Sequence, residues 1–226
     1  MWRYTRHPKF ALAPAQYIRA FLLIQQDLQR LFEFIEPADE NLPAYSFRTH
    51  ELLLRACVEV EANCKAILTE NGYPRNGDLT MNHYRKLNAT HHLSSYEVSL
   101  PVWNGQSRIR KPFEAWAAGT RLPWYDAYNA TKHDRYSVFH QASFEQTIDA
   151  VAGLLVVLSA QFHTDDFEPV SYLKTRTGDR YDGTEVGIGG YFQVRFPTDW
   201  PQEERYDFHW QLIMNEPDPF DQLTFA

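Results

Sequence analysis

The run over 150–158 is the most apolar stretch of the chain and restricts the available folds more than any other feature. It lies within a predicted helix over 144–163 that is apolar nearly all round. Such a helix has to be covered on every side, either at the centre of a bundle or in a subunit interface. Ser143 and Gln146 fit a helix-start box, in which the hydroxyl caps a backbone N–H and the amide reaches back.

Two long segments ahead of this helix carry apolar residues at helical spacing, one over 14–35 and one over 45–71. A short link joins them, so we expect them to pack as an antiparallel pair. A weaker helix over 79–93 and a helix over 123–133 complete the pattern. The sequence therefore predicts a mainly α protein, an antiparallel bundle of four to five helices.

The periodicity changes to alternation near residue 96, and Asn104-Gly105 is a strong signal for a tight turn. We therefore expect a β-hairpin near 96–111, inserted between helices.

Beyond residue 164 the chain becomes rich in glycine and β-forming residues, with strands expected over 186–196 and 208–214. Gly187, Gly189 and Gly190 are interpreted as part of a β-turn. We assign 1–164 to the helical bundle and 165–226 to a C-terminal extension with short strands, packed on the bundle.

Composition excludes some functions and leaves others open. A net charge of −7 argues against nonspecific electrostatic binding of nucleic acid by the whole surface. A small local basic cleft remains compatible with this net charge. Cys57 and Cys64 lie about two helical turns apart, too far to form a disulfide, and are interpreted as small buried hydrophobes. The N-terminus has no apolar signal core and no run is long enough to span a membrane. We expect a cytoplasmic protein with no membrane partner.

Arg135 and His140, in the connection before the last predicted helix, are the candidate catalytic residues. Arginine presents a planar fork that fits a phosphate, and histidine exchanges a proton near neutral pH. Together they could cleave a phosphodiester without a metal, with the arginine holding the charged phosphorane. The alternative is structural, with Arg135 paired to Asp126 or Asp134 and His140 placed at a helix start.

Four neighbours extend this candidate site. Lys132 and His133 could add positive charge for substrate binding, or could simply offset the carbonyls at the end of a helix. Asn129 and Asp134 are expected to support the shape of the connection. Asn129, Lys132 and His133 fall on one face of the predicted helix over 123–133.

The block YNATKHDR, followed by Phe139 and SFEQTIDAVAGLLVVL, resembles helical proteins of the HEPN superfamily. The resemblance covers roughly 14–163, and 48–68 is similar to the long second helix of such proteins. Their signature, an arginine and a histidine separated by four to six residues between the last two core helices, maps onto Arg135 and His140. The resemblance implies a homodimeric, metal-independent RNA endonuclease of toxin or defence type.

The alternative is a catalytically inactive helical module that dimerises or docks a partner through 144–163 and the aromatic-rich tail. Tyr136 favours it, because active members of the family usually carry Asn, Asp or His after the arginine. We expect no cofactor and no metal, since the spacing of His83, His91 and His92 matches no zinc pattern.

Overall fold

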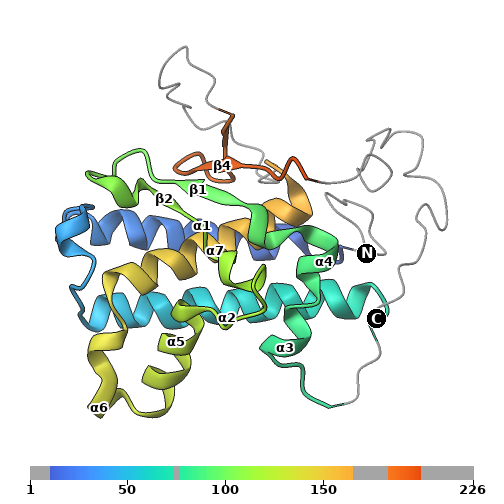
Figure 1. The fold of residues 1–226 in the computed structure, drawn as a ribbon, viewed down its shortest axis with the longest axis horizontal. Helices are drawn as coiled ribbons and strands as arrows, with labels where there is room; N and C mark the ends of the chain where they lie inside the picture. Colours follow the sequence, from blue (N-terminus) through green and yellow to red (C-terminus); the bar gives the residue numbers. More distant parts are fainter. Residues whose placement is uncertain (1–10, 74–76, 165–182, 200–226) are drawn as a thin grey trace.

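The computed structural model describes residues 11–73, 77–164 and 183–199 (Figure 1). In this part the protein is mainly helical, with a small antiparallel sheet of four strands in the order β2-β1-β4-β3. The longer helices are α1 (Pro14–Leu31), α2 (Phe47–Glu70), α5 (Pro123–His133) and α7 (Phe144–Phe162). Shorter helices are α3 (Met81–Tyr84), α4 (Leu87–His91) and α6 (Arg135–Val138), and the 3-10 turns are η1 (Asp39–Asn41), η2 (Leu93–Ser95), η3 (Gln106–Arg108), η4 (Glu114–Trp116) and η5 (Phe139–Gln141). The strands are β1 (Glu97–Ser99), β2 (Ile109–Arg110), β3 (Glu185–Val186) and β4 (Gln193–Arg195).

Helix α7 is the centre of the core. Every residue over 150–162 is buried, and α1, α2, α5 and the sheet pack around it. Elements of the same chain therefore cover this apolar helix, and a subunit interface is not needed to bury it. The apolar run over 150–162 leaves no side chain exposed, so it offers no surface for the partner docking predicted for 144–163. None of the helices in the described residues is both long and apolar enough to cross a membrane.

The directions of the long helices follow from contacts far apart in the sequence. The start of α1 meets the end of α2, where the Leu12 N–H donates to Glu70 Oε2 over 3.3 Å. This gives α1 and α2 the antiparallel arrangement expected for the pair. Helix α7 runs parallel to α2, since Thr147 Oγ1 donates to the Thr49 carbonyl over 3.1 Å and Gln161 Nε2 reaches Asn63 Oδ1 over 3.4 Å.

Two local predictions need correction. The helix predicted over 79–93 is broken into α3 and α4. The backbone between them forms 3-10 hydrogen bonds between residues three apart, such as that from the Lys86 N–H to the His83 carbonyl. At the start of α7, Ser143 Oγ accepts from the Gln146 N–H over 3.3 Å, but Gln146 Oε1 has no partner among the described residues. The reciprocal half of the helix-start box is therefore absent.

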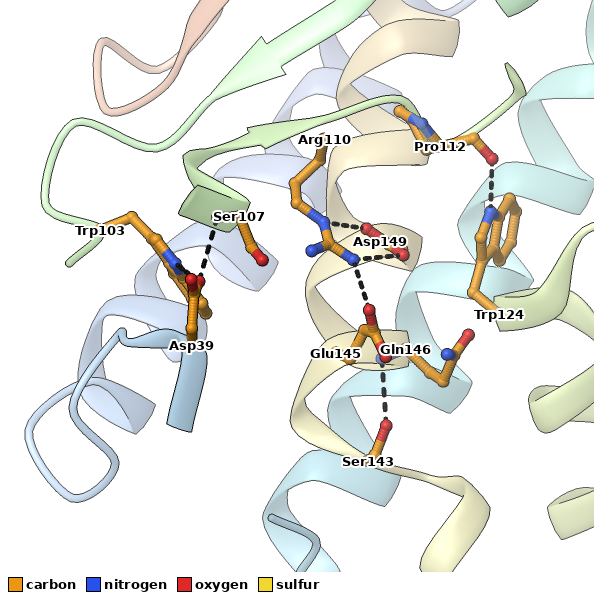
Figure 2. A network of polar contacts seen from close by, with 10 residues as sticks. All are labelled: Asp39, Trp103, Ser107, Arg110, Pro112, Trp124, Ser143, Glu145, Gln146 and Asp149. Atoms are coloured by element: carbon orange, nitrogen blue, oxygen red, sulfur yellow. Dashed lines mark hydrogen bonds and ion pairs between the residues drawn. The ribbon is translucent and has the colours of Figure 1, made fainter. Parts of the chain in front are cut away.

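The inserted hairpin is present, but its connection differs from the predicted tight turn. Strands β1 and β2 pair antiparallel, whereas residues 100–108 form a longer loop held by the Asp39 carboxylate. That carboxylate accepts from Trp103 Nε1 (2.8 Å) and from the Ser107 N–H (3.0 Å), as Figure 2 shows. It also accepts from the Gln106 N–H (2.7 Å). A distant carboxylate thus decides the shape of a loop whose local sequence favours a two-residue turn.

The described part of the C-terminal extension, 183–199, lies on the helical body and continues the sheet of the hairpin. Strand β4 pairs antiparallel with β1 and with β3. The turn between β3 and β4 contains the glycines noted above, and Gln25 Nε2 of α1 donates to the Gly189 carbonyl over 3.1 Å. Phe192 and Val194 are buried. The strand predicted over 208–214 lies outside the described residues.

Asp39→Asn should lower the urea midpoint of unfolding at pH 7, and this difference should shrink in acid. Hydrogen bonds, first that of Trp103, lower the pKa of Asp39 to about 2. Because this pKa lies below the ordinary value of about 3.9, the ionised group stabilises the fold above that pH. The contribution is lost as the pH falls through about 2. Urea unfolding of the wild type and of Asp39→Asn at pH values from 7 down to about 2 measures this loss of stability. Asp78→Asn, at an exposed aspartate, is the control. A difference in urea midpoint between the wild type and Asp39→Asn that stays constant with pH would contradict this prediction.

Candidate functional site

The chain between α5 and α7 folds into two short elements that carry the candidate residues. Helix α5 ends at His133, and Asp134 then caps α6 by accepting the Ser137 N–H on Oδ1 over 3.2 Å. The turn η5 follows directly and leads into α7. Figure 1 shows α6 at one end of the helical body, beside the start of α7. Asp134 therefore shapes this connection, the supporting role expected of it.

Arg135 is exposed and rests on an aromatic ring. Its Cζ lies 5.4 Å from the centroid of Phe47, the first residue of α2, within the range of a cation–π interaction. Among the described residues, no carboxylate lies within ion-pair distance of it. Asp126 is paired with Arg121 at 2.6 Å, and the Asp134 carboxylate caps α6. The structural pairing considered for Arg135 is therefore not found, and its guanidinium faces solvent.

His140 is also exposed and joins the same group of rings. Its ring lies 6.5 Å from that of Tyr45, at a steep angle. Phe139 contacts Tyr45 (5.6 Å) and Phe47 (4.9 Å) between ring centroids. We call Tyr45, Phe47, His50 and Phe139 the aromatic cluster. Arg135 and His140 both lie on it, so a single surface presents a guanidinium and an imidazole to solvent.

His50 is a member of this cluster that sequence reasoning missed. It is 6% exposed, its ring packs edge-on against Phe139 at 5.7 Å, and its Nε2 has no hydrogen-bond partner among the described residues. Burial, and then the charge of Arg135, lower the pKa of His50 below its ordinary value. This shift favours the neutral form of the ring. Its position three residues after Phe47 on one helix was the available signal.

The other predicted residues do not gather around Arg135. Lys132 Nζ donates to the Tyr128 hydroxyl over 3.0 Å and lies 5.0 Å from that ring, so it folds back along α5. His133 is exposed at the end of α5. Asn129 lines a different cavity together with Asp126, and within the described chain its side chain has no hydrogen bond to the connection. The support expected from Asn129 is therefore not seen.

His83, His92 and the two cysteines have structural surroundings. His83 Nδ1 accepts from the Thr80 N–H over 2.9 Å, and His92 pairs with Asp199 at 3.3 Å. In residues 11–73, 77–164 and 183–199, no three His, Cys, Asp or Glu side chains are grouped to hold a metal. Cys57 and Cys64 are free and buried, as interpreted from their spacing, and burial raises the pKa of both thiols.

Comparisons with protein-family models, with curated proteins and with solved structures give no significant match to this chain. The features of this chain that bear on its function are therefore the sequence block over 128–140 and the surface that carries Arg135 and His140.

Proposed function

We propose that this protein is a metal-independent RNA endonuclease of toxin or defence type, with Arg135 and His140 as its catalytic residues. One observation carries the proposal. An exposed arginine with no carboxylate partner in the described chain lies on the same aromatic cluster as an exposed histidine. Its guanidinium rests on the Phe47 ring with no carboxylate partner in the described chain, so its planar fork is open to a phosphate.

The chemistry follows from the two side chains. His140 moves a proton, either from the 2′-hydroxyl that attacks the phosphorus or to the 5′-oxygen that leaves. Arg135 forms two parallel hydrogen bonds to the phosphorane oxygens and stabilises their charge in the transition state. Phe47 holds the guanidinium in place through the contact with its ring. Tyr45 and Phe47 are 52% and 66% exposed, so their rings also give neighbouring bases a surface for stacking.

The lowered pKa of His50 favours a neutral ring beside Arg135. A second cation beside Arg135 would compete with it for the phosphate and repel it, whereas a neutral ring leaves the arginine as the dominant charge. His133, exposed at the end of α5, is assigned to a phosphate next to the one that is cut, whereas Lys132, which donates to the Tyr128 hydroxyl, is not. The proposal includes an antiparallel bundle of HEPN type and a homodimer that places two such pairs in one basic cleft.

The test is RNA cleavage by the purified full chain in the presence of EDTA. We expect products that end in 2′,3′-cyclic phosphates, because the 2′-hydroxyl is the nucleophile. Arg135→Ala should lower the cleavage rate about 10²–10³-fold, the usual effect of removing one group that stabilises transition-state charge. Arg121→Ala, which removes an exposed arginine elsewhere, is the control. The proposal fails if diverse RNAs remain uncut, or if Arg135→Ala cuts as fast as the wild type.

The alternative is a non-catalytic module that binds a partner through this same end of the molecule. It is favoured by Tyr136, whose side chain is 99% exposed directly after Arg135 and would gain from being covered. The cleavage assay separates the two functions, because the module leaves RNA intact.

A further inference from the structure

A cavity of ≈ 460 Å³ lies between α3, η4 and the first turns of α5, and no step of the proposed RNA cleavage uses it. Its volume is within the range of small-molecule sites in proteins. One wall is apolar and is formed by Leu79, Met81, Trp116 and Leu122. The rest is polar and contains two arginines, one carboxylate and the side-chain amide of Asn129.

The two arginines are held at the cavity by short hydrogen bonds. Arg85 Nη1 donates to the Gly119 carbonyl over 2.6 Å, and Arg121 Nη2 lies 2.6 Å from Asp126 Oδ1. A guanidinium has five N–H donors, so each contact orients the exposed group toward the cavity lining and leaves other donors for a ligand. These tethers reduce the conformational entropy that binding would otherwise cost.

The charge of the lining selects the class of anion. Two guanidinium groups and the single carboxylate of Asp126 give the cavity a formal charge of about +1, in a chain whose net charge is −7. A carboxylate matches this charge and fits the planar fork of arginine. A phosphate dianion would leave an excess negative charge beside Asp126, which is unfavourable.

Asn129 adds a second polar contact at a defined distance. It lies three residues after Asp126 on α5, which places it about 4.5 Å farther along the helix axis. Its amide is half-buried and, in the part of the chain that the structure describes, has no hydrogen-bond partner. The hydroxyl of Tyr125 is already used, since it donates to Glu61 Oε1 over 2.6 Å. The amide is thus left to bind a polar group of the ligand.

We infer that this cavity binds a small hydroxyaryl carboxylate. The carboxylate would lie between Arg85 and Arg121, the planar ring against the apolar wall, and the hydroxyl on the Asn129 amide. This site is separate from Arg135 and His140 and does not depend on the proposed RNA cleavage.

The test is isothermal titration calorimetry of the full chain with 4-hydroxybenzoate. The neutral 4-hydroxybenzamide and the dianion phenyl phosphate should each bind at least about tenfold more weakly, because one lacks the charge and the other carries too much. Arg85→Gln keeps a donor for Gly119 but loses the charge, and should weaken 4-hydroxybenzoate about tenfold or more. Arg19→Gln, an exposed arginine on α1, is the matched control and should bind as the wild type does.

A second pair of measurements tests the contact to Asn129. Asn129→Ala should weaken 4-hydroxybenzoate several-fold but leave the affinity for benzoate, which has no hydroxyl, unchanged. The inference is overturned if millimolar 4-hydroxybenzoate gives no binding heat, if the neutral amide binds equally well, or if Arg85→Gln binds like the control. Loss of RNA cleavage in Arg135→Ala would not bear on any of these outcomes.

Discussion

Replacement of Arg110 by methionine should lower the free energy of unfolding by about 3–5 kcal/mol, the usual cost of removing one partner from a buried ion pair. Arg110 lies on β2 and its side chain is 11% exposed. Its Nε and Nη2 donate to Asp149 of α7 over 2.6 and 2.8 Å, and Nη2 also donates to Glu145 over 3.2 Å (Figure 2). Methionine fills a similar volume but leaves the Asp149 carboxylate buried without its cation.

The pH dependence of this loss identifies its cause. Burial already raises the pKa of Asp149, and Arg110 opposes that rise. Without Arg110 the pKa climbs further. The pKa of Asp149 is then higher in the folded state than in the unfolded state. The stabilisation that this difference gives is fully present below the unfolded pKa and is lost as the pH rises through the folded pKa. The deficit of Arg110→Met should therefore be smaller at pH 5 than at pH 8.

Urea unfolding followed by circular dichroism measures both effects. The double variant Arg110→Met with Asp149→Leu should recover most of the lost stability, because it removes the stranded charge as well. Arg30→Met is the matched control. It breaks an exposed pair with Asp27 and should cost less than about 1 kcal/mol. Equal instability of the single and double variants would show that the buried carboxylate is not the cause.

His140→Ala should reduce the rate of RNA cleavage about 10²–10⁴-fold, the range for loss of a group that transfers a proton in the transition state. His140 is exposed and its ring contacts only Tyr45 among the aromatic contacts of the described residues, so its removal should leave the fold intact. Single-turnover cleavage of a labelled RNA gives the rate, and a thermal unfolding curve checks the fold.

Two further variants sharpen this result. His140→Gln retains a hydrogen-bonding side chain but cannot take up a proton, so it should be as slow as His140→Ala. His83→Ala removes a histidine that caps α3 away from the site, and should cleave at the wild-type rate. Wild-type cleavage by His140→Ala, or an equal loss in His83→Ala, would remove His140 from the mechanism.

Local sequence was sufficient for the regular elements. Helix α5 was predicted over its observed bounds, because Pro123 suits a first helical turn. The need to cover α7 on every side also followed from its residues, which left open whether the bundle or a subunit interface covers it. Both predictions use interactions between residues a few positions apart, or the balance of apolar and polar side chains on one element.

The failures occurred where distant parts of the chain meet. Asn104-Gly105 favours a tight turn locally, yet Asp39 holds the loop open with three hydrogen bonds from a different segment. His50 gave little signal in the sequence, because its burial beside Phe139 and Arg135 depends on how α2 meets the chain after α5.

The sequence by itself determined that the protein is mainly helical, which helix has to be covered on every side, and that Arg135 and His140 fall in one connection. Only the tertiary structure decided that Arg135 lies over Phe47, that His140 contacts Tyr45, and that Asn129 lines a separate cavity. The physical reason is the distance along the chain over which the interactions act. Helical periodicity is set by neighbours along the chain, whereas a site is formed by side chains from several elements, and their meeting depends on the packing of the whole core.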